Sequence, residues 1–293
     1  MKPSRIIILG HSGFIGSRLM ARLTELHPDV PVVGASLTGL DLEDPESAGR
    51  LGALFDPDAL VVMCAAIKRQ LGDTADIYLK NTAIIVNFAN LLARHPVRRV
   101  VYFSSCAVYG EDIENLAITE ESALVARSYY GQSKITAEWI LERTVAGLPQ
   151  TQLGLLRPAT IYGPGDLATA YGPSGFLDAA VHNRPLTLWG DGSELRELLY
   201  IDDVVEAAAA YVTTDHVGPL NLVAGQSYRF SDALEAVKAI VGRLPEITSR
   251  PRSKPKVDNV FDNAALRRVL PGVTFRPLAE GIRQMHKARY TTA

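Results

Sequence analysis

The chain has 293 residues, of which 47% are hydrophobic and 21% are charged, and its formal net charge is −2. This composition is typical of a globular protein with a substantial core, and the nearly neutral charge gives no reason to expect a nucleic-acid partner. The apolar runs are far shorter than a membrane span, so no membrane partner is expected.

The first predicted element is a buried strand over Ile6–Leu9 that leads directly into a glycine-rich turn and a helix over 14–26. Glycines at this spacing allow a tight turn, close approach of a pyrophosphate and close packing of the helix on the strand. The start of the helix would attract the phosphates through its dipole. The cofactor-binding candidates in this turn are Gly10, Ser12, Gly13, Phe14, Ile15 and Gly16.

Short apolar runs alternate with helical patterns through the first half of the chain. The predicted strands are Ile6–Leu9, Val30–Ala35, Ala59–Met63, Val100–Ser104 and Leu153–Leu156, and the helical patterns lie near 14–26, 45–55, 73–95 and 128–146. This alternation predicts an α/β fold built on a doubly wound parallel sheet of the Rossmann type. Ligands of such sheets bind beyond the carboxyl ends of the strands, so the chemistry is expected just after Leu9, Met63, Ser104 and Leu156.

Proline and glycine become dense after Arg157-Pro158, and the predicted strands shorten. We therefore predict a dinucleotide-binding domain over 1–157 and a smaller, mainly substrate-binding region over 158–293. Residues near 195–216, with a helix over 202–213, are expected to rejoin the first domain. The basic, proline-rich stretch at 249–256 is either a solvated connector or part of a phosphate site.

Tyr130 and Lys134 are four residues apart in a predicted helix, so their side chains share one face. At about 4 Å and an effective dielectric of about 20, an ammonium favours a phenolate by about 4 kcal/mol, or at most about three pKa units. We expect Lys134 to lower the pKa of Tyr130 towards neutrality, where it can exchange protons with a sugar hydroxyl or ketone. Ser105 follows a buried strand and is expected either to bind the same reacting oxygen or to cap backbone groups.

These features resemble the extended short-chain dehydrogenase/reductases of the nucleotide-sugar epimerase, dehydratase and ketoreductase group. The resemblance covers nearly the whole chain and includes the motifs at 64–66, 156–165, 189–196, 200–204 and 221–225. It implies an NAD(P) cofactor, with Tyr130 as acid/base, Lys134 on the nicotinamide ribose and Ser105 orienting the substrate oxygen. The further cofactor positions are Asp41, Leu42, Cys64, Ala65, Ala66 and Pro158.

The resemblance also implies a nucleotide-sugar substrate. Arg196 matches the arginine that grips the diphosphate, for which a planar, bidentate donor is suited. Trp189 matches an aromatic position that stacks on the nucleotide base, although it is also interpretable as a core or domain-contact residue. Lys68 is either a phosphate ligand or a solvated loop residue. The other expected substrate contacts are Ser105, Cys106 and Thr160.

The residue at the end of the second predicted strand bears on the choice of cofactor. NAD-binding folds carry an acid about 20 positions after the glycines, where it binds the ribose hydroxyls. This chain has Ser36 there, which does not repel a 2′-phosphate as an acid would. NADPH is therefore favoured, but no arginine stands beside Ser36, so NAD stays open.

The residues after Ser105 bear on the reaction. Cys106-Ala107-Val108 stands where dehydratases of the resembled family carry an Asp-Glu pair, so a dehydratase is not expected. Cys106 is one position away from the cysteine that epimerase-reductases of the family use, and this offset favours a packing role. The predicted function is an NAD(P)H-dependent reductase of a 4-keto-6-deoxy nucleotide sugar. The alternatives are an NAD-dependent 4-epimerase and a non-catalytic NAD(P)-binding sensor, against which the retained Ser105, Tyr130 and Lys134 argue.

The remaining expectations concern location and assembly. The first strand begins within five residues of the start, which leaves no room for a signal peptide, and the two cysteines lack metal-ligand spacing. We therefore expect a cytoplasmic protein with reduced thiols and no metal site. The helices near 73–95 and 128–146 carry apolar residues, including Ile135 and Trp139, away from the catalytic face, and the resemblance implies a homodimer through them.

Overall fold

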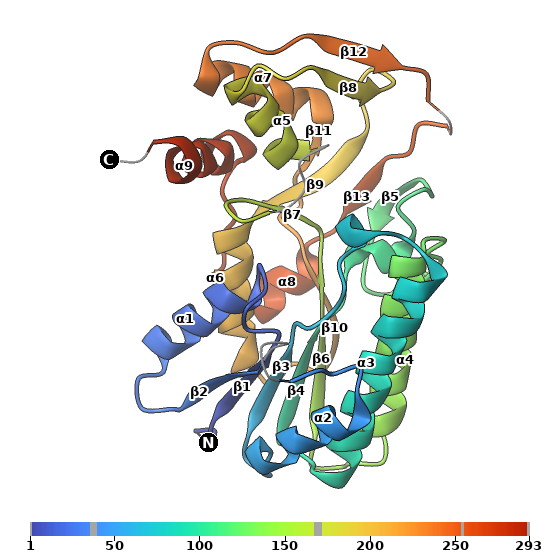
Figure 1. Cartoon of the computed structure of the whole chain (residues 1–293), viewed down its shortest axis with the longest axis vertical. Helices are drawn as coiled ribbons and strands as arrows, with labels where there is room; N and C mark the ends of the chain where they lie inside the picture. Colours follow the sequence, from blue (N-terminus) through green and yellow to red (C-terminus); the bar gives the residue numbers. More distant parts are fainter. Residues whose placement is uncertain (1, 36–39, 167–171, 253–254, 292–293) are drawn as a thin grey trace.

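The computed structural model describes residues 2–35, 40–166, 172–252 and 255–291 (Figure 1). Its central sheet has six strands that pair in parallel. The strands are, in spatial order, β10 (Gly218–Leu222), β6 (Gln152–Pro158), β4 (Arg99–Phe103), β3 (Leu60–Met63), β1 (Ile6–Leu9) and β2 (Val32–Ala35). The predicted doubly wound sheet is thus confirmed, with β2 two residues shorter than expected at its start and β6 longer at both ends.

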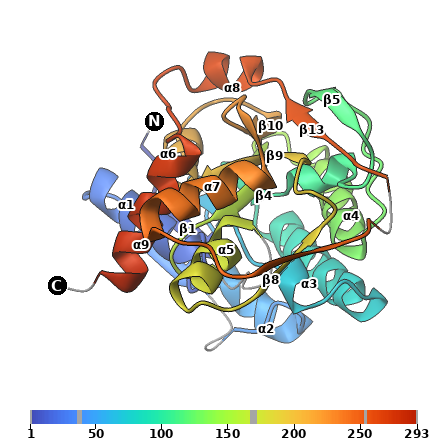
Figure 2. The same cartoon turned by 90° about the horizontal axis from the view of Figure 1, so that it is seen from above.

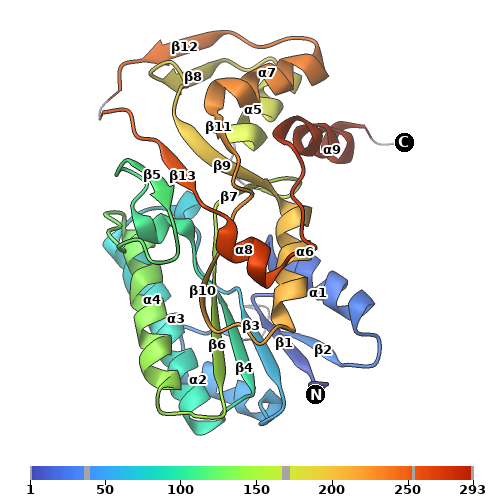
Figure 3. The same cartoon turned by 180° about the vertical axis from the view of Figure 1, so that it is seen from behind.

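Helices cover both faces of this sheet (Figures 1 and 3). One face carries α2 (Pro45–Gly49), α3 (Ala75–Arg94) and α4 (Tyr129–Val145), and the other carries α1 (Gly16–Leu26) and α6 (Ile201–Val212). Alternate strand residues point to opposite faces. Ile8 accordingly packs in one apolar cluster with Leu23 of α1, and its neighbour Ile7 packs in another with Phe88 of α3. Burial on both faces explains why these strands are continuous apolar runs.

Within the described residues of the first half of the chain, three short 3₁₀ helices join the other elements. They are η1 (Arg50–Leu54), η2 (Arg69–Leu71) and η3 (Cys106–Tyr109). The helical pattern predicted over 45–55 is therefore split between α2 and η1. η3 follows β4 directly and begins after Ser105, whose side chain caps it.

The second part of the chain stands over the carboxyl ends of the strands, as the view from above shows (Figure 2). Its strands form small sheets: β7 (Thr160–Tyr162), β9 (Leu195–Tyr200) and β11 (Ser227–Arg229); β8 (Leu186–Trp189) and β12 (Ile247–Arg250); and β13 (Asn259–Phe261), which pairs with β5 (Asn115–Ile118) of the first part. Its helices are α5 (Gly172–Val181), α7 (Phe230–Val241), α8 (Ala264–Val269) and α9 (Leu278–Tyr290).

The chain returns to the first part after β9. α6, where a helix over 202–213 is predicted, packs beside α1, and β10 pairs with β6 at the edge of the main sheet. β6 itself runs through Arg157 and Pro158, so the domain boundary between them stays a prediction. No helix in the described ranges combines the length and apolar character needed to cross a membrane.

A buried ion pair fixes α4 to the end of β6. The Arg157 guanidinium donates to both carboxylate oxygens of Glu138, at 2.9 and 2.6 Å, and the two side chains are 4% and 3% exposed. Arg157 also donates to the Tyr109 hydroxyl at 2.7 Å, which in turn donates to Asn221 of β10 at 2.8 Å. This network joins α4, β6, η3 and β10 beneath the strand ends.

Replacing Glu138 by alanine would leave the Arg157 guanidinium buried without its counter-ion. We expect Glu138→Ala to lower the free energy of unfolding by about 3–5 kcal/mol in urea titrations. Lys80→Ala, which breaks an exposed i,i+4 pair with Asp76, is the matched control and should lower the free energy of unfolding far less, because solvent screens the pair. An equally small loss in both variants would contradict the structural role of the buried pair.

Candidate active site

The glycine turn between β1 and α1 has no room for side chains at its two ends. Gly10 has a φ of +86°, and a Cβ there would lie 2.8 Å from the amide nitrogen of Ala65. A Cβ on Gly16 would lie 2.2 Å from the carbonyl oxygen of Gly10. The turn thus passes closely between α1 and the loop after β3. Strand order reverses at this point, and dinucleotides bind in such a crevice.

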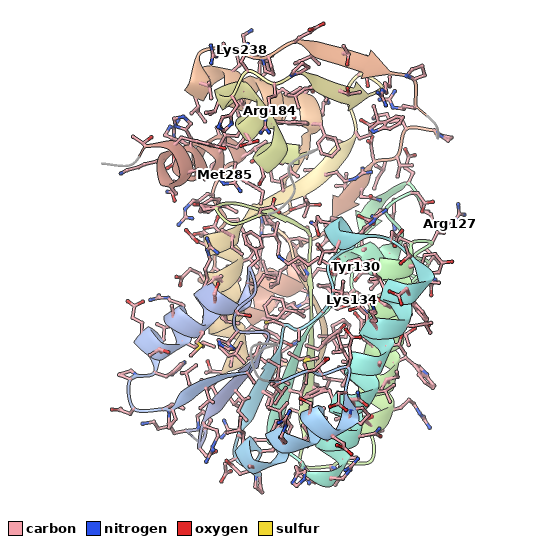
Figure 4. The ribbon with its side chains drawn as sticks, viewed as in Figure 1. Arg127, Tyr130, Lys134, Arg184, Lys238 and Met285 are labelled. Carbon is pink, nitrogen blue, oxygen red and sulfur yellow. The ribbon has the colours of Figure 1, made fainter. Side chains whose placement is uncertain are left out.

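A cavity of about 270 Å³ lies at the carboxyl ends of the strands, beneath the second part of the chain. The loops after β1, β3, β4 and β6 line it from below, and β7 and β9 add residues from above. Figure 4 shows Tyr130 and Lys134 near the end of α4 that faces this junction. The predicted site residues that the structure brings together here are Phe14, Ile15, Cys64, Ala66, Lys68, Ser105, Cys106, Tyr130, Lys134, Pro158, Thr160 and Arg196.

Tyr130 and Lys134 face this cavity from the first two turns of α4. The Lys134 ammonium lies 5.8 Å from the centre of the Tyr130 ring. It donates to the hydroxyl of Tyr102 at 3.1 Å and to the carbonyl oxygen of Phe103 at 2.7 Å, so β4 holds it in place. The Tyr130 phenol instead shares a hydrogen bond with Ser105.

Burial controls the protonation of this pair. It raises the pKa of Tyr130 to about 12, against a smaller lowering by the hydrogen bond with Ser105. It lowers the pKa of Lys134 to about 8. The expected lowering of the Tyr130 pKa towards neutrality is therefore wrong for the chain by itself, because loss of hydration disfavours the phenolate. At neutral pH the site holds a protonated phenol beside an ammonium.

The side chains after β4 also have structural roles. The Ser105 hydroxyl accepts from the backbone N–H of Ala107 at 3.1 Å, so this serine caps η3 as well as bonding to Tyr130. The Cys106 thiol donates to the carbonyl oxygen of Arg157 at 3.1 Å. Burial raises the pKa of Cys106 well above its ordinary value, which keeps it a thiol. This geometry agrees with a packing role for Cys106 at the cavity wall.

Cations reach the cavity from two sides. The Arg196 guanidinium, on β9, donates to the carbonyl oxygens of Leu195 and Val257 at 2.8 and 2.7 Å. The Lys68 ammonium, in the loop after β3, lies 4.8 Å from the centre of the Phe14 ring, and burial lowers its pKa. Both side chains line the cavity, so neither is an ordinary solvated surface cation.

Several predicted residues lie away from the cavity wall. Trp189 ends β8, pairs in register with Arg250, is 47% exposed and is not among the residues that line this cavity. Leu42 packs into the core, and the Asp41 carboxylate accepts from the N–H of Glu43. Ser36 lies outside the described residues. The glycine-loop and backbone positions that do not line this cavity are Gly10, Ser12, Gly13, Gly16 and Ala65.

Basic residues of the stretch at 249–256 form ion pairs with acidic residues of the second part of the chain. Arg252 donates to Glu194 at 2.6 Å and also pairs with Asp191, and Lys256 pairs with Asp258 at 2.6 Å. These contacts agree with the connector interpretation. In the part of the chain that the structure describes, no three His, Cys, Asp or Glu side chains are grouped to hold a metal ion.

The predicted site includes none of the three described acidic residues that line the cavity, Glu111, Asp166 and Glu197, and Glu197 is the most deeply buried of them. Glu197 is 1% exposed, and burial raises its pKa to about 7. Its position beside Arg196 in a recognised motif was the available signal. A glutamate in a strand is ordinarily solvent-exposed, and only the packing of β9 against the loop after β10 reveals its burial.

Residues 6–223 match the model of the NAD dependent epimerase/dehydratase family. The chain belongs to this family. The predicted resemblance and the prediction of an enzyme are thereby confirmed.

Individual members of the family share about a quarter of their residues with this chain. The UDP-glucuronic acid decarboxylase 1 of Arabidopsis thaliana is 25% identical over 86% of this chain, which spans only 62% of that protein. A dTDP-4-dehydro-6-deoxy-D-allose reductase of Streptomyces sp. is 26% identical to this chain. The alignment covers 85% of this chain and 86% of the reductase. The structure of the Thermus thermophilus UDP-glucose 4-epimerase in complex with NAD is 25% identical, covers 96% of this chain and 97% of its own, and gives a TM-score of 0.81.

The glycine turn fits the cofactor of this family. A side chain on Gly10 or Gly16 would fill the space between the turn, α1 and the loop after β3, so the backbone itself forms the surface of the crevice. Phe14 and Ile15, at the start of α1, continue that surface into the cavity. When bound there, an NAD-type cofactor supplies hydride chemistry.

The lowered pKa of Lys134 predicts a pH limit for cofactor binding. Below about pH 8 the side chain is an ammonium that can donate charge-assisted hydrogen bonds, and above it the charge is lost. We expect the affinity for NADH and NADPH, measured by fluorescence titration from pH 7 to 9.5, to fall as the pH rises through about 8. Lys134→Met should remove this step. A step that persists in the variant would assign it to another group, such as Lys68.

Proposed function

We propose that this protein is an NAD(P)H-dependent reductase of a nucleoside diphosphate 4-keto-6-deoxy sugar. The observation that carries the proposal is the protonated Tyr130 phenol, hydrogen-bonded to Ser105 in the same cavity as Lys134. Reduction of a ketone needs a proton donor at the carbonyl oxygen, whereas epimerisation at C4 begins with removal of a hydroxyl proton. A phenol whose pKa is about 12 suits the first task. The likeness to the dTDP-4-dehydro-6-deoxy-D-allose reductase also supports this choice.

The proposed reaction adds a hydride and a proton across a carbonyl bond. A reduced nicotinamide cofactor, when held in the crevice at the glycine turn, would supply the hydride. Tyr130 gives its phenolic proton to the carbonyl oxygen, Ser105 hydrogen-bonds that oxygen, and water later reprotonates the phenolate. The nearby Lys134 ammonium stabilises the phenolate formed in this step and holds the ribose.

Two positively charged side chains at the cavity wall support a substrate that carries phosphates. We assign Arg196 and Lys68 to the phosphates of the substrate, because both are cations at the cavity wall. Following the family resemblance, we assign Pro158 to the cofactor and Thr160 to the sugar. NADPH is preferred on the basis of Ser36 in the sequence. Two free cysteines and a nicotinamide cofactor fit a cytoplasmic location.

The alternative is an NAD-dependent 4-epimerase, which the likeness to the Thermus thermophilus enzyme supports. Cofactor stoichiometry separates the two reactions. A reductase should oxidise one NADPH for each dTDP-, GDP-, CDP- or UDP-4-keto-6-deoxy sugar that it converts, followed at 340 nm. Conversion of a nucleotide sugar to its C4 epimer without net change of cofactor would contradict the reductase and establish the epimerase.

Tyr130→Phe tests the proton donor within the same assay. Removing the hydroxyl should lower kcat by about 10²–10⁴-fold, because no other group in this position donates the proton. The affinity for NADPH should stay within about twofold, since the ring remains. Tyr129→Phe is the matched control, because Tyr129 is the neighbouring residue and is 47% exposed. Equal activity of both variants would exclude catalysis by Tyr130.

We also propose a homodimer formed through α3 and α4. These helices pack side by side and expose large apolar side chains: Leu79 is 63% exposed, Trp139 62% and Val86 38%. An apolar surface of this kind on adjacent helices is typical of a protein interface.

Trp139→Glu would place a charge at this surface. Light scattering should give twice the chain mass of 31.8 kDa for the parent protein and close to the single mass for the variant. Leu116→Glu is the control, because Leu116 is 58% exposed but lies on β5. A monomeric parent protein would contradict the proposed dimer.

A further inference from the structure

An ion pair joins two loops at the rim of the cavity. Arg69, in η2, and Glu111, in the loop after η3, form this pair, and both side chains line the cavity. They are 44% and 45% exposed, whereas most of the other lining residues are buried or half-buried. The pair therefore lies where the cavity meets the solvent, and a ligand in the cavity can contact both side chains. The proposed reaction uses neither of them.

The segment that carries Arg69 is held at both ends. Asn81 of α3 accepts from the backbone N–H of Ile67 at 2.8 Å and donates to its carbonyl oxygen at 3.1 Å. Asp73 accepts from the backbone N–H of Tyr130 at 2.9 Å, at the start of α4. Because both ends of this short segment are held, Arg69 can change its partner by rotating its side chain, without a movement of the loop.

Glu111 also contacts a cation that we assign to the diphosphate. The Arg196 guanidinium donates to the backbone carbonyl oxygen of Glu111 at 3.3 Å, while Arg69 pairs with the carboxylate of the same residue. A single residue thus separates the two guanidinium groups. Lys68, which we also assign to the phosphates, precedes Arg69 and lines the same cavity. A diphosphate held by Arg196 and Lys68 therefore lies close to the Arg69 side chain.

The ion pair is of a kind that exchanges readily. Ion pairs between solvent-exposed side chains contribute little to stability, because water and salt screen them. A guanidinium gains more from phosphate oxygens, with which it forms bidentate, charge-assisted hydrogen bonds. A carboxylate at the same place repels an incoming phosphate. Binding of a phosphate therefore favours the transfer of Arg69 from Glu111 to the ligand.

We propose that Arg69 is a further ligand of the substrate diphosphate and that Glu111 competes with the diphosphate for this arginine. The inference rests on the proposed function, because it needs a ligand that carries phosphates in this cavity. Before the ligand binds, Glu111 holds the guanidinium at the rim. When the phosphate takes its place, the carboxylate turns to the solvent, where water hydrates it. Glu111 thus makes the substrate bind more weakly than the cations alone would allow.

Calorimetric titration without cofactor tests both residues. UDP, dTDP, GDP and CDP are titrated into the parent protein, and the diphosphate that binds most tightly is kept. Glu111→Gln removes the competing charge and should tighten its binding about 3- to 10-fold. Arg69→Met removes a charge-assisted donor and should weaken its binding about 10-fold or more. Arg69→Lys keeps the charge but not the bidentate geometry, so its affinity should lie between those of the parent protein and Arg69→Met.

The double variant separates competition from simple repulsion. If Glu111 acts by holding Arg69, then Glu111→Gln should change the affinity of the Arg69→Met protein by about twofold or less, because there is no arginine to release. If Glu111 only repels the phosphates, the substitution should tighten binding by the same factor with and without Arg69. That second result would overturn the competition.

Matched controls use charges outside the cavity. Glu114→Gln removes an exposed carboxylate from the same loop as Glu111, and Arg127→Met removes an arginine that is 71% exposed in its pair with Asp112. None of these three residues lines the cavity. Both control variants should bind the nucleoside diphosphate within about twofold of the parent protein. The midpoint of thermal unfolding reports whether each variant is folded.

A cofactor titration identifies the source of the phosphate. The affinity for NADPH, followed by fluorescence, should stay within about twofold in Glu111→Gln and in Arg69→Met. Changes in NADPH affinity with no change for the nucleoside diphosphate would overturn the assignment of Arg69 to the substrate.

The binding data also distinguish this inference from the function on which it rests. Unchanged affinity for the nucleoside diphosphate in folded Glu111→Gln and Arg69→Met would overturn the inference and leave the nucleotide-sugar function standing. Failure of every nucleoside diphosphate and every sugar nucleotide to bind the parent protein would overturn both.

Discussion

Two buried cations hold α4 against the ends of the sheet, and the geometry of the site depends on them. Lys134 bonds to Tyr102 and to the carbonyl oxygen of Phe103, and Arg157 pairs with Glu138. Each contact joins one helix to a different strand, β4 or β6. Together they fix the rotation of α4, which decides whether Tyr130 faces the cavity or the solvent. The exposed Tyr129, one position earlier, shows the other outcome.

The burial that creates this geometry also sets the protonation of the site. A charge that loses its hydration is disfavoured, so the phenol of Tyr130 stays protonated and the lysine holds its proton less tightly. The same effect acts on Glu197 across the cavity. The site therefore holds groups whose protonation responds to the entry of charged or hydrogen-bonding ligands, as functional sites commonly do.

The two parts of the chain contribute different kinds of groups to the cavity. The end of β4 provides Ser105 and the first turns of α4 provide Tyr130 and Lys134, which are suited to proton transfer and cofactor contact. β9 brings Arg196, a cation suited to a phosphate, over the same cavity. Because the chain then returns through α6 and β10 to the main sheet, these groups stand on a frame that is continuous with the sheet.

The sequence by itself determined the doubly wound sheet, the glycine turn and the family, because these depend on local patterns. Apolar runs buried on both faces predict parallel strands, and Gly10 and Gly16 stand where no side chain fits. Only the tertiary structure decided the protonation of Tyr130, the burial of Glu197 and the exposure of Trp189. Each of these follows from what packs around a side chain, and residues far apart in the sequence determine that. The spacing of Tyr130 and Lys134 correctly placed both on one face of a helix, but it could not show that Tyr102 and Phe103 would hold the ammonium and that burial would outweigh its charge.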